Sequence, residues 1–175
     1  MFDSNQFFGG GGETGFYPKT IEQSLRFNDN DSAYLSWTPA SAGNRKTWTW
    51  SGWVKHGSLP TGQITLFDAS SASNQQHGIV FATNQFYVFG YTTTFTYRKQ
   101  LSAVHRDPSA WYHYVVTFDT TNATASDRIK IYVNGVRQTD FSGTNTDPTL
   151  NYDTGFNNTV VHGVSAGMAD FAIVD

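Results

Sequence analysis

Residues 110–135, "AWYHYVVTFDTTNATASDRIKIYVNG", carry the clearest structural pattern in this chain. Within residues 112–118 every second residue is apolar (Tyr, Tyr, Val, Phe), which is the period of a β-strand that buries one face. Residues 129–133 alternate in the same way and lead into Asn134-Gly135, a pair that favours a type I′ hairpin turn because both residues tolerate positive φ. The stretch therefore predicts two strands and a hairpin that pack on a core.

The same period-two pattern recurs along the chain from Ile21 onward, with turn residues between about a dozen predicted strands and no helical periodicity. This pattern predicts an all-β domain, either a two-sheet sandwich or a barrel. Strands at 24–27 and 168–174 are expected to pair at one edge. The strands at 47–57 and 85–91 are apolar on both faces, so we expect each to be covered on both sides.

The composition supports this fold class and excludes several functions. The 175 residues include 14 Phe, 9 Tyr and 5 Trp, residue types that favour pleated sheets. A net charge of −3 without any run of Lys or Arg argues against nucleic acid as a ligand. The absence of cysteine rules out disulfides, thiolate metal sites and a cysteine nucleophile.

Residues 1–20 differ from the predicted sandwich at 21–175. Four consecutive glycines cannot join a regular element without a large entropic cost, and four aromatic residues flank them: Phe7, Phe8, Phe16 and Tyr17. The segment is either a flexible tail or an assembly arm that becomes ordered against a neighbouring subunit. It has no secretory signal pattern, and no apolar run long enough to span a membrane occurs in the sequence. We therefore expect synthesis in a cytoplasm and no membrane insertion.

Three pieces of the sequence resemble a known family. They are "TWTWSGWVK" (47–55), "WYHYVVTFD" (111–119) followed by "IKIYVNGV" (129–136), and the closing "MADFAIVD" (168–175). Together they are similar to concanavalin A-like jelly rolls of the laminin-G-like type. The resemblance implies an antiparallel two-sheet β-sandwich with jelly-roll topology.

A narrower resemblance concerns the biological setting. The stretches "FYPKTIEQSLRF", "SLRFNDNDSAYLSWTP" and the whole of 107–135 look like modules in virion structural proteins of tailed bacteriophages. That resemblance implies a virion protein, either a capsid decoration or a tail or fibre component. Its implied partners are other virion proteins and further copies of itself. A free-standing carbohydrate-binding, lectin-like module is the alternative interpretation.

The same fold family includes glycoside hydrolases, so catalysis must be considered. Those enzymes use paired carboxylates on either side of the glycosidic bond. This sequence contains only Glu13 and Glu22, both near the N-terminus, and no two Asp residues alternate on a predicted strand. We therefore expect a protein that is not an enzyme.

Two kinds of binding site remain candidates. Laminin-G-like domains often hold calcium at the rim of the sandwich, and Asp68 and Asp119, each predicted at a strand end, could supply the oxygen ligands. The alternative is that both carboxylates cap their own loops.

The resemblance also implies binding of a glycan, which would be a host surface glycan for a virion protein. Aromatic rings stack on sugar faces and loop amides bond sugar hydroxyls. The candidates in or near predicted loops are Asn74, Gln75, Tyr91, Tyr97 and Arg98.

Overall fold

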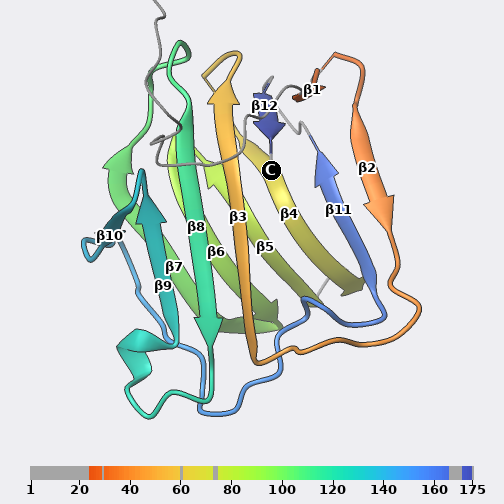
Figure 1. Ribbon diagram of the computed structural model, residues 1–175, viewed down its shortest axis with the longest axis vertical. Helices are drawn as coiled ribbons and strands as arrows, with labels where there is room; N and C mark the ends of the chain where they lie inside the picture. Colours follow the sequence, from red (N-terminus) through yellow and green to blue (C-terminus); the bar gives the residue numbers. More distant parts are fainter. Residues whose placement is uncertain (1–23, 29, 60, 73–74, 166–170, 175) are drawn as a thin grey trace, which may run out of the picture.

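The computed structural model describes residues 24–28, 30–59, 61–72, 75–165 and 171–174. Twelve strands in these ranges form two six-stranded sheets that face each other, and all strand pairs are antiparallel (Figure 1). The prediction of an all-β, two-sheet antiparallel sandwich is therefore confirmed. No helix in the described part of the chain is long and apolar enough to cross a bilayer.

The first sheet contains the segment on which the fold prediction rested. Its strands, in spatial order, are β1 (Leu25–Phe27), β12 (Phe171–Val174), β3 (Thr47–His56), β8 (Tyr112–Asp119), β9 (Ile129–Val133) and β10 (Val136–Gln138). The pairing of β1 with β12, which brings the two ends of the described chain together, was predicted and is confirmed.

The second sheet is built largely from consecutive hairpins. Its strands, in spatial order, are β2 (Tyr34–Trp37), β11 (Val161–Ser165), β4 (Gln63–Ala72), β5 (Gln75–Ala82), β6 (Gln85–Thr92) and β7 (Thr94–Val104). The edge at β7 is extended by the segment 140–147, because Arg98 and Thr146 exchange two backbone hydrogen bonds of 2.8 and 2.9 Å. The edge at β2 is free of such cover within the described residues.

The core lies between the two sheets and consists mostly of rings and β-branched side chains. Tyr114, Val116 and Phe118 of β8 are buried there as the alternation predicts, and they meet Phe81, Phe86 and Val88 of the second sheet. The hairpin turn also follows the prediction, since Asn134 and Gly135 have φ of 50° and 80°.

Two expectations about strands that are apolar on both faces need correction. In β3, Trp48, Trp50 and Val54 pack on the core, but Trp53 lies on the outer face, and the described residues contain no third layer above it. In β6, Phe86 and Val88 are in the core, while Tyr87 and Phe89 form a separate outer cluster with Val80. The outer apolar residues are thus covered mainly by one another and by neighbouring side chains.

Candidate functional site

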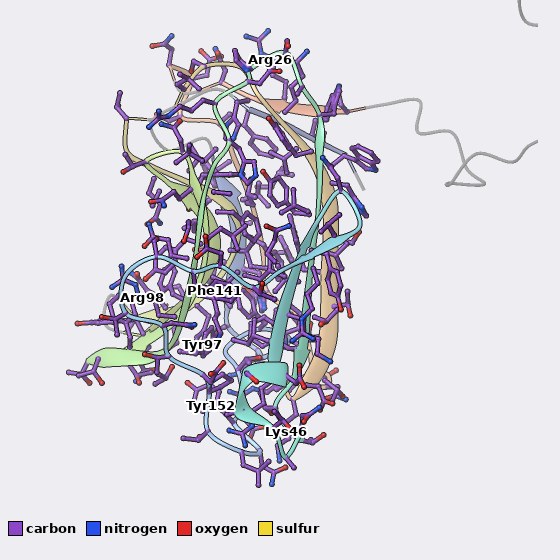
Figure 2. The ribbon with its side chains drawn as sticks, turned by 90° about the vertical axis from the view of Figure 1, so that its left-hand side faces the viewer. Arg26, Lys46, Tyr97, Arg98, Phe141 and Tyr152 are labelled. Atoms are coloured by element: carbon purple, nitrogen blue, oxygen red, sulfur yellow. The ribbon has the colours of Figure 1, made fainter. Side chains whose placement is uncertain are left out.

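A polar pocket opens at one end of the sandwich, where the hairpin between β4 and β5 meets the segment 150–160. Its volume is about 140 Å³. The lining residues that carry polar or aromatic groups are Arg45, Ser71, Gln75, His77, Thr92, Tyr152, Asp153 and Asn158. We call this the rim pocket. Lys46 and Tyr152 mark this end of the molecule at the bottom of Figure 2.

One wall of the rim pocket is held in place by Arg45. Its Nε donates to the carbonyl of Thr154 at 2.7 Å, and the Thr154 hydroxyl donates back to the carbonyl of Arg45 at 2.8 Å. The indole of Trp48 donates to the same hydroxyl at 3.1 Å. Because Trp48 also stacks on Phe118 in the core, with ring centroids 4.2 Å apart, the pocket wall is connected to the packed interior.

The floor of the pocket is the buried imidazole of His77. Its Nδ1 lies 2.8 Å from the hydroxyl of Tyr97, which is fully buried. The backbone of Gly155 packs closely against the ring, since a Cβ at that position would lie 2.2 Å from His77 Cδ2. Burial and, to a smaller extent, the nearby Arg45 guanidinium together lower the pKa of His77 to about 4, so this ring is neutral at neutral pH.

The groups that line the rim pocket are mainly hydrogen-bond donors and acceptors, a set that suits a small hydroxyl-rich group. Arg45 is a charged donor, Asp153 is an exposed acceptor, and Gln75 supplies an amide whose oxygen accepts from the Ser71 hydroxyl at 2.7 Å. Tyr152 adds an aromatic ring whose hydroxyl donates to Thr96 at 3.1 Å. Asp153 is the one carboxyl group among the lining residues, so the pocket has no carboxylate pair.

The structure separates the residues predicted to bind a glycan into different places. Gln75, the first residue of β5, lines the rim pocket. Tyr97 was expected near a loop, but this is wrong, because it lies inside β7 and is fully buried beneath His77. Tyr91 and Arg98 lie on the outer face of the second sheet. Asn74 and the arm residues Phe7, Phe8, Phe16 and Tyr17 lie outside the described residues.

The outer aromatic cluster is a second surface, distinct from the rim pocket. Figure 2 shows Tyr97 pointing between the sheets and Arg98, the next residue, pointing away from them. The Arg98 guanidinium lies over the rings of Tyr87 and Phe95, 5.3 and 5.0 Å from their centroids. Tyr87 and Phe89 are each only 8% exposed, so the ring surface that this cluster offers to a ligand comes mainly from Phe95, which is 42% exposed.

The two aspartates proposed as calcium ligands do not form a common site. Asp119 does end β8, but its Oδ1 accepts hydrogen bonds from the backbone and hydroxyl of Thr121, which is the loop-capping role. Asp68 was expected at a strand end, which is wrong, because β4 continues to Ala72. Asp68 lies in the other sheet, and burial raises its pKa despite a hydrogen bond from the Gly163 backbone. Among the described residues no cluster of three metal-ligating side chains occurs.

Several residues of the rim pocket were not predicted as site residues from the sequence. Arg45 lies in a loop more than 100 positions before the segment that contains Asp153 and Asn158. Only the pairing of β3 with β8 and the return of the chain through 150–160 bring them together. The available signal was the polar loop 142–155 itself, whose composition indicates a loop but not its neighbours.

A group of buried polar atoms lies toward the opposite end of the sandwich. Both ring nitrogens of His56, Nδ1 of His105 and the hydroxyl of Tyr114 are buried without a hydrogen-bond partner among the described residues. The His105 and Tyr114 rings lie 5.5 Å apart. Burial, together with a smaller contribution from His105, lowers the pKa of His56 to about 4. Burial also lowers the pKa of His105. These groups are neutral members of the core.

Comparison with known proteins supports the fold independently. The mouse laminin α1 chain, domains LG4-5, has a TM-score of 0.56 at 10% identity, over 90% of this chain and 42% of that one. The binding domain of botulinum neurotoxin DC in complex with SialylT has a TM-score of 0.53 at 11% identity, over 86% and 36%. A structure of botulinum neurotoxin type C has a TM-score of 0.50 at 12% identity, also over 86% and 36%. This chain thus spans less than half the length of each.

Sequence comparison gives a family. None of the curated proteins is a significant match to the chain. The Laminin_G_3 family model, described as the concanavalin A-like lectin/glucanases superfamily, matches residues 28–172, which include both sheets almost completely. The chain therefore belongs to the Laminin_G_3 family of concanavalin A-like lectin/glucanase domains.

Proposed function

We propose that this domain is a non-enzymatic carbohydrate-binding jelly roll whose ligand enters the rim pocket. The observation that carries the proposal is the pocket itself, which is lined by a charged donor, a carboxylate, two amides, several hydroxyls and the Tyr152 ring. Vicinal sugar hydroxyls both donate and accept hydrogen bonds, so such a mixed set of partners suits them. The volume of about 140 Å³ is well below the roughly 300–1,000 Å³ of pockets for drug-sized ligands, which fits one sugar unit at a chain end.

The similar structures supply a second, weaker support. The botulinum neurotoxin type C structure concerns cell entry that depends on interaction with two ganglioside molecules. Gangliosides are glycolipids, so that structure connects the sandwich with glycan recognition. At 12% identity the likeness concerns the fold alone, and the site in this chain rests on its own residues.

The biological setting that we propose is the virion of a tailed bacteriophage. The domain would be displayed on the particle as a capsid decoration or a tail or fibre component, and residues 1–20 would dock it on other virion proteins. This part of the proposal rests on the resemblance of 16–39 and 107–135 to virion modules. A free-standing lectin-like module would share the rim pocket but would not need the arm.

Two experiments test these parts separately. Glycan binding is tested by applying the purified chain to a glycan array, where reproducible binding of at least one glycan class is expected. The virion setting is tested by deleting residues 1–16 and following incorporation into phage particles by mass spectrometry. The truncated protein is expected to remain folded and to be lost from particles, whereas undiminished incorporation would contradict the role of the arm.

A further inference from the structure

Among the described residues, strand β2 is an open edge of its sheet, and its composition is unusual. All four of its residues are exposed, including Tyr34 at 70%, Leu35 at 48% and Trp37 at 45%. It pairs with β11 on one side, and no backbone hydrogen bond within the described residues joins its other side to anything. In Figure 1 it forms the outer border of its sheet. Such an edge presents unpaired N–H and C=O groups that can accept another strand.

The other described edges carry the protection that β2 lacks. The edge at β7 is covered by segment 140–147. In β10, Arg137 forms an ion pair with Asp127, and β1 contains Arg26 at its centre. By contrast, no charged residue occurs from Ser32 to Asn44, so nothing on β2 repels an identical strand.

The two faces of β2 determine how a second strand could align with it. Leu35 and Trp37 pair with Val164 and His162, which point to the core side, so both lie on the inner face. Trp37 stacks on Phe67 and His162 at 5.7 and 5.5 Å, which fixes its ring. Ser36 therefore lies on the outer face, because successive side chains alternate.

We infer that β2 is the dimerisation strand of this protein and that its partner is β2 of a second copy, paired antiparallel about a two-fold axis at Ser36. In an antiparallel pair, directly opposed residues lie on the same face of the sheet. If the two copies are related by a two-fold axis and form one continuous sheet, the axis must pass through a residue that faces its own copy. Centring on Ser36 places each Leu35 against Trp37 of the other copy. The two six-stranded sheets then form one sheet of twelve strands.

This inference is independent of glycan binding, although the dimer would carry two rim pockets. Two linked pockets raise the apparent affinity for a surface that displays many copies of a glycan. The open edge would be buried on association, which removes an aggregation-prone feature from the surface.

The test uses charge at the proposed axis. In the full-length chain, Ser36→Lys and Ser36→Glu each place two like charges directly opposite, roughly 4.5–5.5 Å apart at Cα. Ser36 is exposed, so both variants should fold, which circular dichroism can check. By light scattering after size exclusion, wild type is expected at twice the chain mass of 19.4 kDa, and each variant at 19.4 kDa.

The decisive step is to mix the two variants. An equimolar mixture of S36K and S36E is expected to return to the doubled mass, because opposite charges then face each other. Val136→Lys, at the exposed edge strand β10, serves as the matched control and should remain a dimer. A wild-type protein at 19.4 kDa, a dimer that persists in S36K, or a mixture that stays at 19.4 kDa would each overturn the inference.

Discussion

Phe86 and Tyr114 stack face to face across the sandwich, with ring centroids 4.5 Å apart and planes 7° from parallel. Phe86 comes from β6 and Tyr114 from β8, so the pair joins the two sheets. Both side chains are fully buried. The Tyr114 hydroxyl, however, has no hydrogen-bond partner in the described part of the chain. Its ring therefore stabilises the fold, while its buried oxygen destabilises it.

Substitutions of these two residues should therefore differ in direction. Phe86→Ala removes a buried ring and leaves a cavity, which we expect to lower the free energy of unfolding by about 3–5 kcal/mol. Tyr114→Phe keeps the stack and removes an unpartnered buried hydroxyl, so stability should be unchanged or higher by about 1 kcal/mol. Urea unfolding followed by fluorescence measures both. A loss of several kcal/mol in Tyr114→Phe would show that the hydroxyl is satisfied in solution.

Acid should destabilise the sandwich through its buried histidines. The pKa values of His56 and His77 are lowered from 6.5 to about 4, mainly by burial. Below pH 6.5 the unfolded chain binds protons at these sites and the folded chain does not, until the pH approaches 4. Stability is thus fully present above pH 6.5 and is lost as the pH falls toward 4, on the order of 3 kcal/mol per histidine.

His56→Phe tests this origin of acid sensitivity. Neither ring nitrogen of His56 has a hydrogen-bond partner within the residues that the structure describes. Its ring packs edge-on against Phe81, with centroids 4.4 Å apart, a contact that phenylalanine can keep. The variant should gain stability at pH 5 relative to wild type and lose less between pH 7 and pH 5. Thermal unfolding across that range is the measurement. An identical pH dependence in the two proteins would assign the acid sensitivity to other groups.

The ion pair between Lys99 and Asp147 should matter far more than the one between Arg137 and Asp127. The Lys99 side chain is 3% exposed, its Nζ lies 2.6 Å from the Asp147 carboxylate, and it also lies over the Phe141 ring. Asp147→Asn leaves a buried ammonium without its counterion, with an expected loss of about 3–5 kcal/mol. Asp127→Asn breaks a pair on the surface, worth about 0–1 kcal/mol. Equal losses in the two variants would contradict the burial argument.

Two glycines near the rim pocket make a matched pair. A Cβ on Gly155 would lie 2.2 Å from the His77 ring, which is buried and bound to Tyr97, so Gly155→Ala must displace the loop that forms the pocket wall. A Cβ on Gly43 would meet nothing closer than 3.6 Å. Gly155→Ala should therefore lower both the melting temperature and glycan binding, while Gly43→Ala changes neither. Normal glycan binding by Gly155→Ala would show that this wall of the pocket does not take part in binding the glycan.

The sequence predicted the fold well because the information was local. Alternation in 112–118 placed Tyr114, Val116 and Phe118 in the core, and Asn134-Gly135 specified its turn. The site was predicted poorly because it is assembled by tertiary structure. Tyr97 alternates correctly within β7, but only the packing of β7 over β8 decides that its ring is buried rather than exposed to a glycan.

The length of β4 illustrates the same limit. The sequence "TLFDAS" suggests a strand that ends at Asp68, whereas β4 continues through two irregularities in its register with β5. Such bulges keep the strand paired while its side-chain alternation shifts, so the pattern alone does not reveal them. For this reason Asp68 was expected at the rim, and it lies on a sheet face.

Three substitutions at neighbouring positions test whether the rim pocket binds a glycan. Gln75 lines the pocket, Gln76 is exposed one residue further along β5 and does not, and Tyr91 belongs to the outer cluster. Calorimetric titration should use the glycan that wild type binds best on the array. We predict at least a tenfold loss of affinity for Gln75→Ala, about 1.4 kcal/mol, and no change for Gln76→Ala or Tyr91→Ala. Loss in Tyr91→Ala with normal binding by Gln75→Ala, or no glycan bound by the folded wild type, would contradict the account.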